Sequence, residues 1–400
     1  MIRFTEENGA LIARSRNETI RIEGWGNNAL RVRTTLLKKL PRDAHALTEN
    51  VAHSAKVTID EGSETAEIVN GKIKATVNGV GIICFYKDNE LILQEYYSYY
   101  YGSVRKEAIC YKIRSREYKG LASDDFKITV RFESDPKEKL FGMGQYQMPI
   151  LDLKGSVLPL EQRNSQVSVP FVVSNKGYGM LWNNPSTGEA AFGTNITKWI
   201  SDESDMVDYW ITADDTPAQI VTNYTECVGR APVMSKDYLG LWQCKLRYRT
   251  PDEVLEVARK YKELGIRLDV IVIDFFHWPH QGDWRFDEKY WSRDAVKAMT
   301  DELHAMGTKV MVSVWPSVDK RSENYYEMEQ KALISTTDVG SVQTYDYEGD
   351  CGTVDFFNPE AQEFVWSKCK QNYRDWGIDL FWLDNSEPDS TKYDFENYRY

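Results

Sequence analysis

Apolar and polar residues alternate over short stretches of the first half of the chain, between about residues 19 and 223. Alternation places every second side chain on the same face, which is the period of a β-strand with one buried face. No helical period persists in this region. The stretches with this alternation or with a strand-like composition are residues 19–23, 30–34, 126–132 and 167–173. We therefore predict a series of short antiparallel strands.

Two pairs of turn-forming residues, Asn70-Gly71 and Asn78-Gly79, lie between β-rich segments. Such pairs accept the positive φ angles of the tight turns that join antiparallel strands, so each pair predicts a hairpin. Short antiparallel strands at this spacing are typical of a β-sandwich. We assign residues 1–230 to an N-terminal β-sandwich domain.

The pattern changes to a helical period near residues 231–233. Thr250-Pro251-Asp252-Glu253 supplies an N-cap, a proline at the first helical position and the glutamate of a capping box. The helix is expected to end at Gly265, and residues 268–274 then predict a buried strand that ends in an acid. The apolar residues that recur at helical spacing before the glycine are Val254, Leu255, Ala258, Tyr261 and Leu264.

The same order of helix, glycine and buried strand occurs twice more. The first repeat extends from Ser292 to the strand 309–315, and the second from Asn358-Pro359 to a strand that ends at Asp384. Residues 239–246 supply an earlier strand, which makes four strands that all run the same way. Such a βα repeat collects the carboxyl ends of its strands on one rim.

Four parallel strands with intervening helices predict the first half of a (β/α)8 barrel. A complete barrel needs about 250 residues, which is more than residues 231–400 supply. The predicted fold class is therefore multidomain, a β-sandwich followed by an incomplete α/β barrel. We expect the C-terminal part of the barrel to lie outside this chain.

Composition and charge argue against some classes of binding partner. The formal net charge of −12 argues against nucleic acid, because binding a polyanion requires clustered lysine and arginine. The N-terminus has no basic segment followed by an apolar one, and no stretch approaches the ~18 apolar residues of a membrane span. We predict a soluble, cytoplasmic protein that contacts neither nucleic acid nor membrane and binds a neutral ligand.

Cysteine and histidine spacing does not predict a metal centre. The six cysteines are scattered without a CxxC pair, which favours reduced thiols over disulfides or a zinc site. His277 and His280 have an HxxH spacing, but Pro279 interrupts helical presentation and no third ligand is near in sequence. We predict no metal and no cofactor.

Three residues stand at predicted strand ends: Asp274, Trp315 and Asp384. The carboxyl ends of parallel strands surround the active site of a barrel, so these side chains are expected to meet. Two carboxylates and an aromatic ring suit a retaining glycosidase acting on one sugar ring. An aspartate after a strand also caps helices or binds loop amides, and Trp315 also suits a core.

Several ordered motifs resemble glycoside hydrolase family 31, especially its α-xylosidase members. The matching segments of the second half are 274–278 (DFFHW), 281–287 (QGDWRFD), 313–316 (SVWP) and 382–388 (WLDNSEP). Segments 141–145 (FGMGQ) and 177–185 (GYGMLWNNP) resemble the N-terminal β-sandwich of the family. The resemblance covers essentially the whole chain and implies a retaining, exo-acting glycoside hydrolase.

The resemblance also implies roles for individual residues. Asp384 matches the catalytic nucleophile of a double displacement, Asp274 the acid that binds hydroxyls of the innermost sugar, and Trp315 a wall of that subsite. Glu387 and Asp389 would disturb an ionised Asp384 if they pointed inward, so we expect them to face other partners. The remaining candidates for substrate contact from these motifs are Phe276, Trp278, Trp382 and Glu387.

Other acids and amides are weaker candidates. The family places its general acid after the nucleophile, and Asp389 and Asp394 follow too closely, so we expect the acid to be absent from this chain. Gln162 and Asn164 are weak candidates from the sandwich. Three acids of the loop after Asp274 are expected to have structural roles: Asp283, Asp287 and Glu288.

The rings that follow Asp274 favour α-xylose over α-glucose as the terminal sugar, because they would occupy the space that the C6 hydroxymethyl group requires. The expected partner is a small or oligosaccharide substrate with a terminal α-glycoside. An α-glucosidase, an α-transglucosidase and a non-catalytic carbohydrate-binding protein remain alternatives. The aglycone and the formation of a homo-oligomer stay open.

Overall fold

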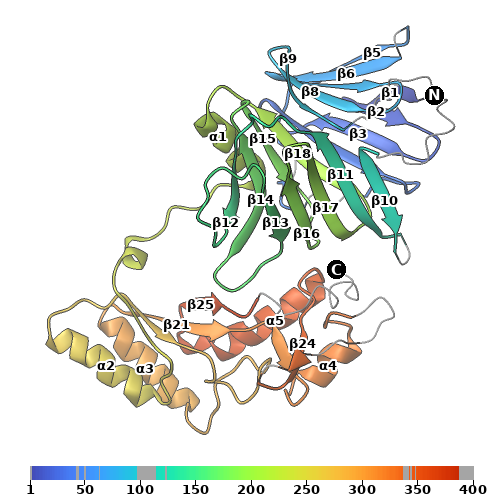
Figure 1. Cartoon of the computed structure of the whole chain (residues 1–400). Coiled ribbons are helices and arrows are strands. Elements are labelled where there is room, and N and C mark those ends of the chain that lie inside the picture. Colours follow the sequence, from blue (N-terminus) through green and yellow to red (C-terminus); the bar gives the residue numbers. More distant parts are fainter. Residues whose placement is uncertain are drawn as a thin grey trace. The chain divides into compact units, whose positions relative to one another are not determined.

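The computed structural model divides the chain into two compact units, Met1–Ala231 and Pro232–Tyr400 (Figure 1). Each unit has its own hydrophobic core and is described by itself. The structure describes residues 2–41, 45–48, 51–62, 64–96, 114–121, 124–336, 342, 345–346 and 348–386.

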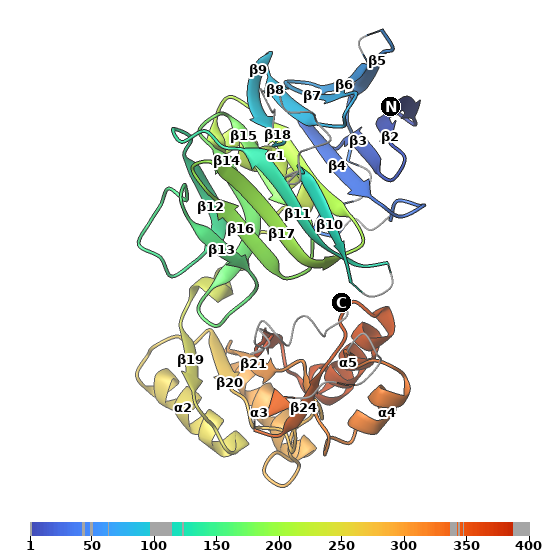
Figure 2. The same ribbon diagram turned by 45° about the vertical axis from the view of Figure 1, so that its right-hand side comes forward.

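The first unit consists of three antiparallel sheets that share one core, which confirms the predicted β-sandwich. The first sheet has the order β1-β2-β3-β4-β18-β15-β14-β12, the second β10-β11-β17-β16-β13, and the third β5-β6-β7-β8-β9 (Figure 2). Alternating burial along β3, β6 and β7 matches the alternating sequence.

The strands of this unit, in chain order, are β1 (Arg3–Glu7), β2 (Ala10–Arg14), β3 (Thr19–Gly24), β4 (Ala29–Thr35), β5 (Lys56–Asp60), β6 (Thr65–Asn70), β7 (Ile73–Asn78), β8 (Ile83–Lys87), β9 (Glu90–Gln94), β10 (Arg116–Gly120), β11 (Phe126–Glu133), β12 (Leu140–Gln145), β13 (Val157–Leu160), β14 (Val167–Ser174), β15 (Tyr178–Trp182), β16 (Gly188–Phe192), β17 (Ile196–Ser204) and β18 (Val207–Ala213).

Both predicted hairpins are present, but only the first has a tight turn. Gly71, with φ of 61°, lies between β6 and β7 and closes a hairpin in which Asn70 pairs with Ile73. The second turn is wider than predicted, because β8 does not begin until Ile83. Its positive φ of 86° falls on Gly81 rather than Gly79. The side-chain oxygen of Asn78 accepts the N–H groups of Val80 and Ile82 and stabilises this longer loop.

The prediction of strands as far as residue 223 is wrong at its end. Helix α1 (Pro217–Val228) begins there, with the hydroxyl of Thr216 accepting the N–H of Gln219 and Pro217 at the first turn. These two residues are an N-terminal helix signal that the strand pattern obscured. Ile220 and Cys227 of α1 pack against the sandwich.

The second unit contains four parallel strands in the order β19-β20-β21-β25, as predicted for the start of a (β/α)8 barrel. Helices α2, α3 and α5 connect consecutive strands, and α2 and α3 lie side by side (Figure 1). The elements are β19 (Trp242–Lys245), α2 (Pro251–Glu263), β20 (Val270–Ile273), α3 (Arg293–Ala305), β21 (Lys309–Val314), α5 (Pro359–Asn372) and β25 (Leu380–Leu383), with short 3-10 helices at Lys236–Leu239 and Arg374–Trp376.

The predicted helix starts are confirmed by side-chain caps. Thr250, Ser292 and Asn358 each accept a backbone N–H from the first turn of the helix that follows. Glu253 binds the N–H of Arg249 rather than that of Thr250, so the capping box closes one residue earlier than in the standard pattern. Leu264, expected on the apolar face of α2, is exposed because the helix ends before it.

Alternation along the strands separates two faces of the parallel sheet. Ile271 and Ile273 of β20 pack against the helices, whereas Val270 and Val272 belong to a small cluster on the opposite face. Strand β25 was expected to be buried on both faces, but Leu383 is 75% exposed. The prediction fails there because β25 is at the edge of the sheet, and no further strand among the described residues covers it.

An insertion between β21 and α5 was not predicted. It carries a three-stranded antiparallel sheet of β22 (Ser317–Asp319), β24 (Asp350–Thr353) and β23 (Tyr345–Asp346), and the short helix α4 (Tyr325–Gln330). Among the described residues, no helix has the length and apolar character needed to cross a membrane.

Candidate active site

The three strand-end residues face the side of the sheet opposite the helices. Val272, Met311 and Leu380 form the apolar cluster on that face. Asp274, Trp315 and Asp384 follow these three residues by two or four positions and therefore lie on the same face. The sheet thus gathers at its carboxyl end the residues that the sequence placed there.

Strand register places Trp315 and Asp384 side by side. Val314 pairs with Leu383 in the parallel ladder, so the residues that follow lie at one level. The N–H of Asp384 donates to the carbonyl of Val314 at 3.1 Å, which extends this pairing by one residue.

The indole of Trp315 holds one oxygen of Asp384. Trp315 is 4% exposed, and its Nε1–H donates to Oδ2 of Asp384 at 3.1 Å. The carbonyl of Trp315 in turn accepts the Nε1–H of buried Trp284 at 3.0 Å. No donor from the described residues contacts Oδ1 of Asp384. Within the described part of the chain, the carboxylate is therefore oriented through Oδ2 alone.

Asp274 is oriented by a backbone amide and a thiol. Its Oδ1 accepts the N–H of Phe275 at 2.8 Å, and the thiol of Cys244 lies 3.5 Å from its Oδ2. Burial and the nearby charge of Asp274 raise the pKa of Cys244 to about 11. Cys244 is therefore a protonated donor at neutral pH, a role that the sequence analysis missed. Its position at the end of the first strand was the available signal.

Aromatic rings surround Trp315. The ring centroids of Phe275, Phe276 and Trp278 lie 5.1, 6.2 and 5.4 Å from that of Trp315. Phe276 has a φ of 62°, a left-handed conformation that is rare for a bulky residue. This backbone turn brings two consecutive phenylalanine rings to the same side, which strand alternation alone would have prevented.

His277 fixes the loop that carries these rings. Its Nδ1 lies 2.9 Å from the carbonyl of Asp274 and must donate, so its Nε2 accepts the hydroxyl proton of Tyr373, also at 2.9 Å. Burial lowers the pKa of His277 to about 4, which keeps the ring neutral. Both nitrogens thus have structural partners, and the described residues contain no cluster of three or more metal-binding side chains.

Three buried polar atoms near these residues have no hydrogen-bond partner within the described ranges. They are Oγ of Ser313, Nε1 of Trp278 and Nδ2 of Asn385. Leaving a polar group buried and unpaired costs free energy, so such atoms are suited to bind hydroxyl groups of a ligand or water.

The remaining candidate site residues are not grouped around Trp315 as the rings described above are. Trp382 follows Leu380 on the same face and is 45% exposed. Glu387, Asp389 and Asp394 lie outside the described residues. Asp283 is buried and accepts the N–H groups of His280 and Glu323, which is a structural role.

Gln162 and Asn164 belong to the first unit. The side chain of Gln162 forms two hydrogen bonds with the backbone of Ser168, so its amide is already satisfied. Asn164 is exposed and accepts a hydrogen bond from Ser165.

In the second unit, Asp287 caps a turn by accepting the N–H of Lys289.

Two family models match the chain. Residues 231–399 match the TIM-barrel domain of glycosyl hydrolases family 31, and residues 19–190 match the N-terminal galactose mutarotase-like domain of glycosyl hydrolase 31. The matches cover both units described above.

Individual relatives agree with these models. An uncharacterized family 31 glucosidase, ORF2, of Pseudescherichia vulneris is 44% identical over 100% of this chain and 77% of its own length. Alpha-xylosidase A of Aspergillus niger is 32% identical over 95% of this chain and 53% of its own. The crystal structure of an alpha-xylosidase from a soil metagenome, complexed with xylose, has a TM-score of 0.90 and 44% identity, covering all of this chain and 60% of that one. The chain thus spans between about half and three quarters of these relatives.

Proposed function

Because this chain belongs to glycoside hydrolase family 31, we propose that the protein is a retaining, exo-acting α-glycosidase that removes terminal α-linked xylose. The observation that carries the proposal is the state of Asp384, which stands at a barrel strand end with Oδ2 held by Trp315 and with no donor to Oδ1 among the described residues. A nucleophile requires such an oriented carboxylate with one free oxygen.

In the proposed reaction, Oδ1 of Asp384 attacks the anomeric carbon as the glycosidic bond breaks. A carboxylic acid protonates the departing oxygen and then removes a proton from water, which releases the sugar with its α configuration retained. We assign this role to a carboxyl group other than Asp274, whose two oxygens are oriented by the N–H of Phe275 and the thiol of Cys244. Asp274 instead binds hydroxyl groups of the terminal sugar.

The preference for xylose rests on the rings around Trp315. Phe276 and Trp278 pack against Trp315. In the proposed pocket these rings would leave little space for a hydroxymethyl group at C6, which xylose lacks. Steric exclusion by rings discriminates more strongly than the loss of one favourable contact, which is worth about 1–3 kcal/mol. The relatives named alpha-xylosidases support the same sugar. The relative named a glucosidase supports an α-glucosidase or α-transglucosidase as the second candidate.

The test is the ratio of kcat/KM for p-nitrophenyl α-xyloside and α-glucoside, measured on the protein that carries this chain. We expect the xyloside to be favoured at least about 10-fold, and Phe276→Ala to reduce the ratio. A preference for the glucoside would establish the second candidate instead.

A separate experiment tests catalysis itself. A 5-fluoro-α-xylosyl fluoride should label the enzyme covalently, and peptide mass spectrometry should locate the label on Asp384. Binding of xylose without any labelling or turnover would indicate a non-catalytic carbohydrate-binding protein.

A further inference from the structure

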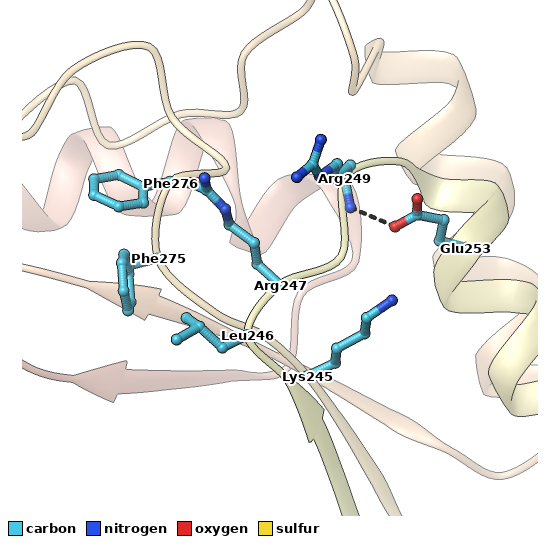
Figure 3. A pocket seen from close by; sticks show the side chains of 7 residues that line it. All are labelled: Lys245, Leu246, Arg247, Arg249, Glu253, Phe275 and Phe276. Carbon is cyan, nitrogen blue, oxygen red and sulfur yellow. Dashed lines mark hydrogen bonds between the residues drawn. The ribbon is translucent and has the colours of Figure 1, made fainter.

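A hollow of about 460 Å³ lies between the ends of two neighbouring strands, β19 and β20, and the start of α2. Figure 3 shows the side chain of Arg247 extending toward the ring of Phe276, with Arg249 on the adjoining wall. Leu246 and Phe275 add apolar surface. All the described lining residues come from the first two βα segments of the unit.

The charge of this hollow opposes that of the chain. Lys245, Arg247 and Arg249 alternate along the segment that leaves β19, and none of them forms an ion pair with a described residue. One carboxylate, that of Glu253, also lines the hollow, and it accepts the backbone N–H of Arg249 at 2.8 Å. Three cations and one carboxylate leave a local positive charge in a chain whose formal net charge is −12.

Four other arginines of the same unit, Arg259, Arg267, Arg285 and Arg321, form ion pairs, whereas Arg293 lies over a ring. Arg285 binds Glu323 at 2.9 Å, and Arg321 binds Asp319 at 2.6 Å. Most arginines of this unit outside the hollow thus have a carboxylate partner, whereas Arg247 and Arg249 have none among the described residues. A guanidinium presents donors in a planar fork that matches carboxylate and phosphate oxygens, so the unused donors of Arg247 and Arg249 favour an anion.

Aromatic packing connects the hollow to the proposed nucleophile. The guanidinium of Arg247 lies 4.7 Å from the centroid of the Phe276 ring, and that ring packs against Trp315 at 6.2 Å. Trp315 donates its indole N–H to Asp384. A cation–ring contact, a ring–ring contact and a hydrogen bond thus connect Arg247 with the carboxylate of Asp384.

We propose that this hollow binds an oxyanion, a carboxylate or a phosphate, carried by the part of the substrate that leaves. This inference rests on the proposed function and specifies its substrate class as an acidic α-glycoside. Arg247 and Arg249 bind the anion, Lys245 adds long-range attraction, and Leu246 and Phe275 contact the apolar face of the sugar that carries it.

Direct binding provides a test that does not depend on turnover. Glucuronate and the isosteric, neutral glucuronamide are titrated into the protein by calorimetry at low salt. Because exposed ion pairs are weak individually, we expect the three cations together to favour glucuronate about 10-fold, and salt to abolish the preference. Glucose 6-phosphate against glucose forms the second arm, and the arm with the larger ratio identifies the oxyanion.

Arg247→Gln and Arg249→Gln should each reduce the preferred ratio about 3-fold. Arg293→Gln is the matched control, because Arg293 also places its guanidinium over a ring, that of Trp376, but lies on α3. Equal affinities within both pairs of ligands, or an equal loss in the Arg293 variant, would overturn the proposal.

A kinetic comparison separates this inference from the proposed function. The substrates are the 4-carboxyphenyl and 4-carbamoylphenyl α-xylosides, which differ in the charge of the leaving group. Faster turnover of the carboxylate, lost in Arg247→Gln, supports the inference. Turnover of both at one rate refutes the anion site alone, whereas anion binding without turnover of any glycoside refutes the proposed function and leaves the site standing.

Discussion

Charged side chains differ between the sandwich and the barrel unit in the partners that they have. In the sandwich, Arg31 and Asp208 are each 1% exposed and form two hydrogen bonds, of 2.6 and 3.0 Å. Asn183 adds a third donor to Asp208. At the strand ends of the barrel unit, Oδ1 of Asp384 has no hydrogen-bond donor among the described residues, and the guanidinium of Arg247 has a ring contact but no ion pair there.

This difference distinguishes the charged groups of the sandwich, which have a structural role, from those at the strand ends of the barrel unit, to which we assign a function. An ion buried without a partner costs several kcal/mol, so the buried guanidinium of Arg31 and the buried carboxylate of Asp208 are retained as a pair. The strand ends are partly exposed, and solvent there reduces the cost of leaving hydrogen-bonding capacity unused. A ligand can replace that solvent, which is the condition for binding and catalysis.

The largest expected effect is the loss of activity in Asp384→Ala. Removing the nucleophile eliminates a step that binding alone cannot replace, so we expect kcat/KM to fall by roughly 10⁴-fold or more. The thermal midpoint should change little, because the side chain is only half-buried and has one described hydrogen bond. Activity near that of the wild type would refute the assignment of Asp384.

The next effect is on stability and concerns the sandwich. Arg31→Met leaves the carboxylate of Asp208 buried without its cation, and we expect the free energy of unfolding to fall by about 3–5 kcal/mol. Urea denaturation measures this change. Arg14→Gln is the control, because its ion pair with Glu7 is exposed and should contribute less than about 1 kcal/mol. Similar losses in both variants would contradict the distinction between buried and exposed pairs.

A pH-dependent effect is expected at His277. Its pKa of about 4 in the folded protein lies below the ordinary 6.5, so the unfolded chain binds a proton first as the pH falls. His277 therefore destabilises the fold progressively between pH 6.5 and about 4, by roughly 3 kcal/mol in total, and has no pH effect above that window.

Replacement with glutamine, which does not titrate, isolates this contribution. Urea unfolding of wild type and His277→Gln at pH 7 and pH 4.5 should show a smaller acid-induced loss in the variant. Equal losses would show that acid destabilisation arises from other groups.

The smallest predicted effect concerns the indole of Trp315. Trp315→Phe keeps a ring but removes the donor to Asp384, and a hydrogen bond to a charged group is worth about 1.5–3 kcal/mol. We expect kcat/KM to fall about 10- to 100-fold. Trp366→Phe, on the exposed face of α5, is the control and should fall less than about 2-fold. An unaffected Trp315 variant would show that the indole N–H is not needed to orient the nucleophile.

Local signals in the sequence determined the secondary structure of both units where they were strong. Thr250, Ser292 and Asn358 open their helices as predicted, because a helix cap depends only on residues within one turn. The parallel strands followed from apolar runs, and their ends identified Asp274, Trp315 and Asp384. The motifs around these residues were sufficient to indicate the family.

The tertiary structure alone decided how these residues contact one another. The hydrogen bond from Trp315 to Asp384 depends on the register of β21 and β25, which are 69 residues apart at this contact. The pairing of β19 with β20 places Cys244 beside Asp274 and also positions Arg247, which follows β19. The left-handed backbone of Phe276 turns its ring toward Trp315. Sequence patterns specify which residues lie on a strand or helix, but long-range packing sets the distances on which chemistry depends.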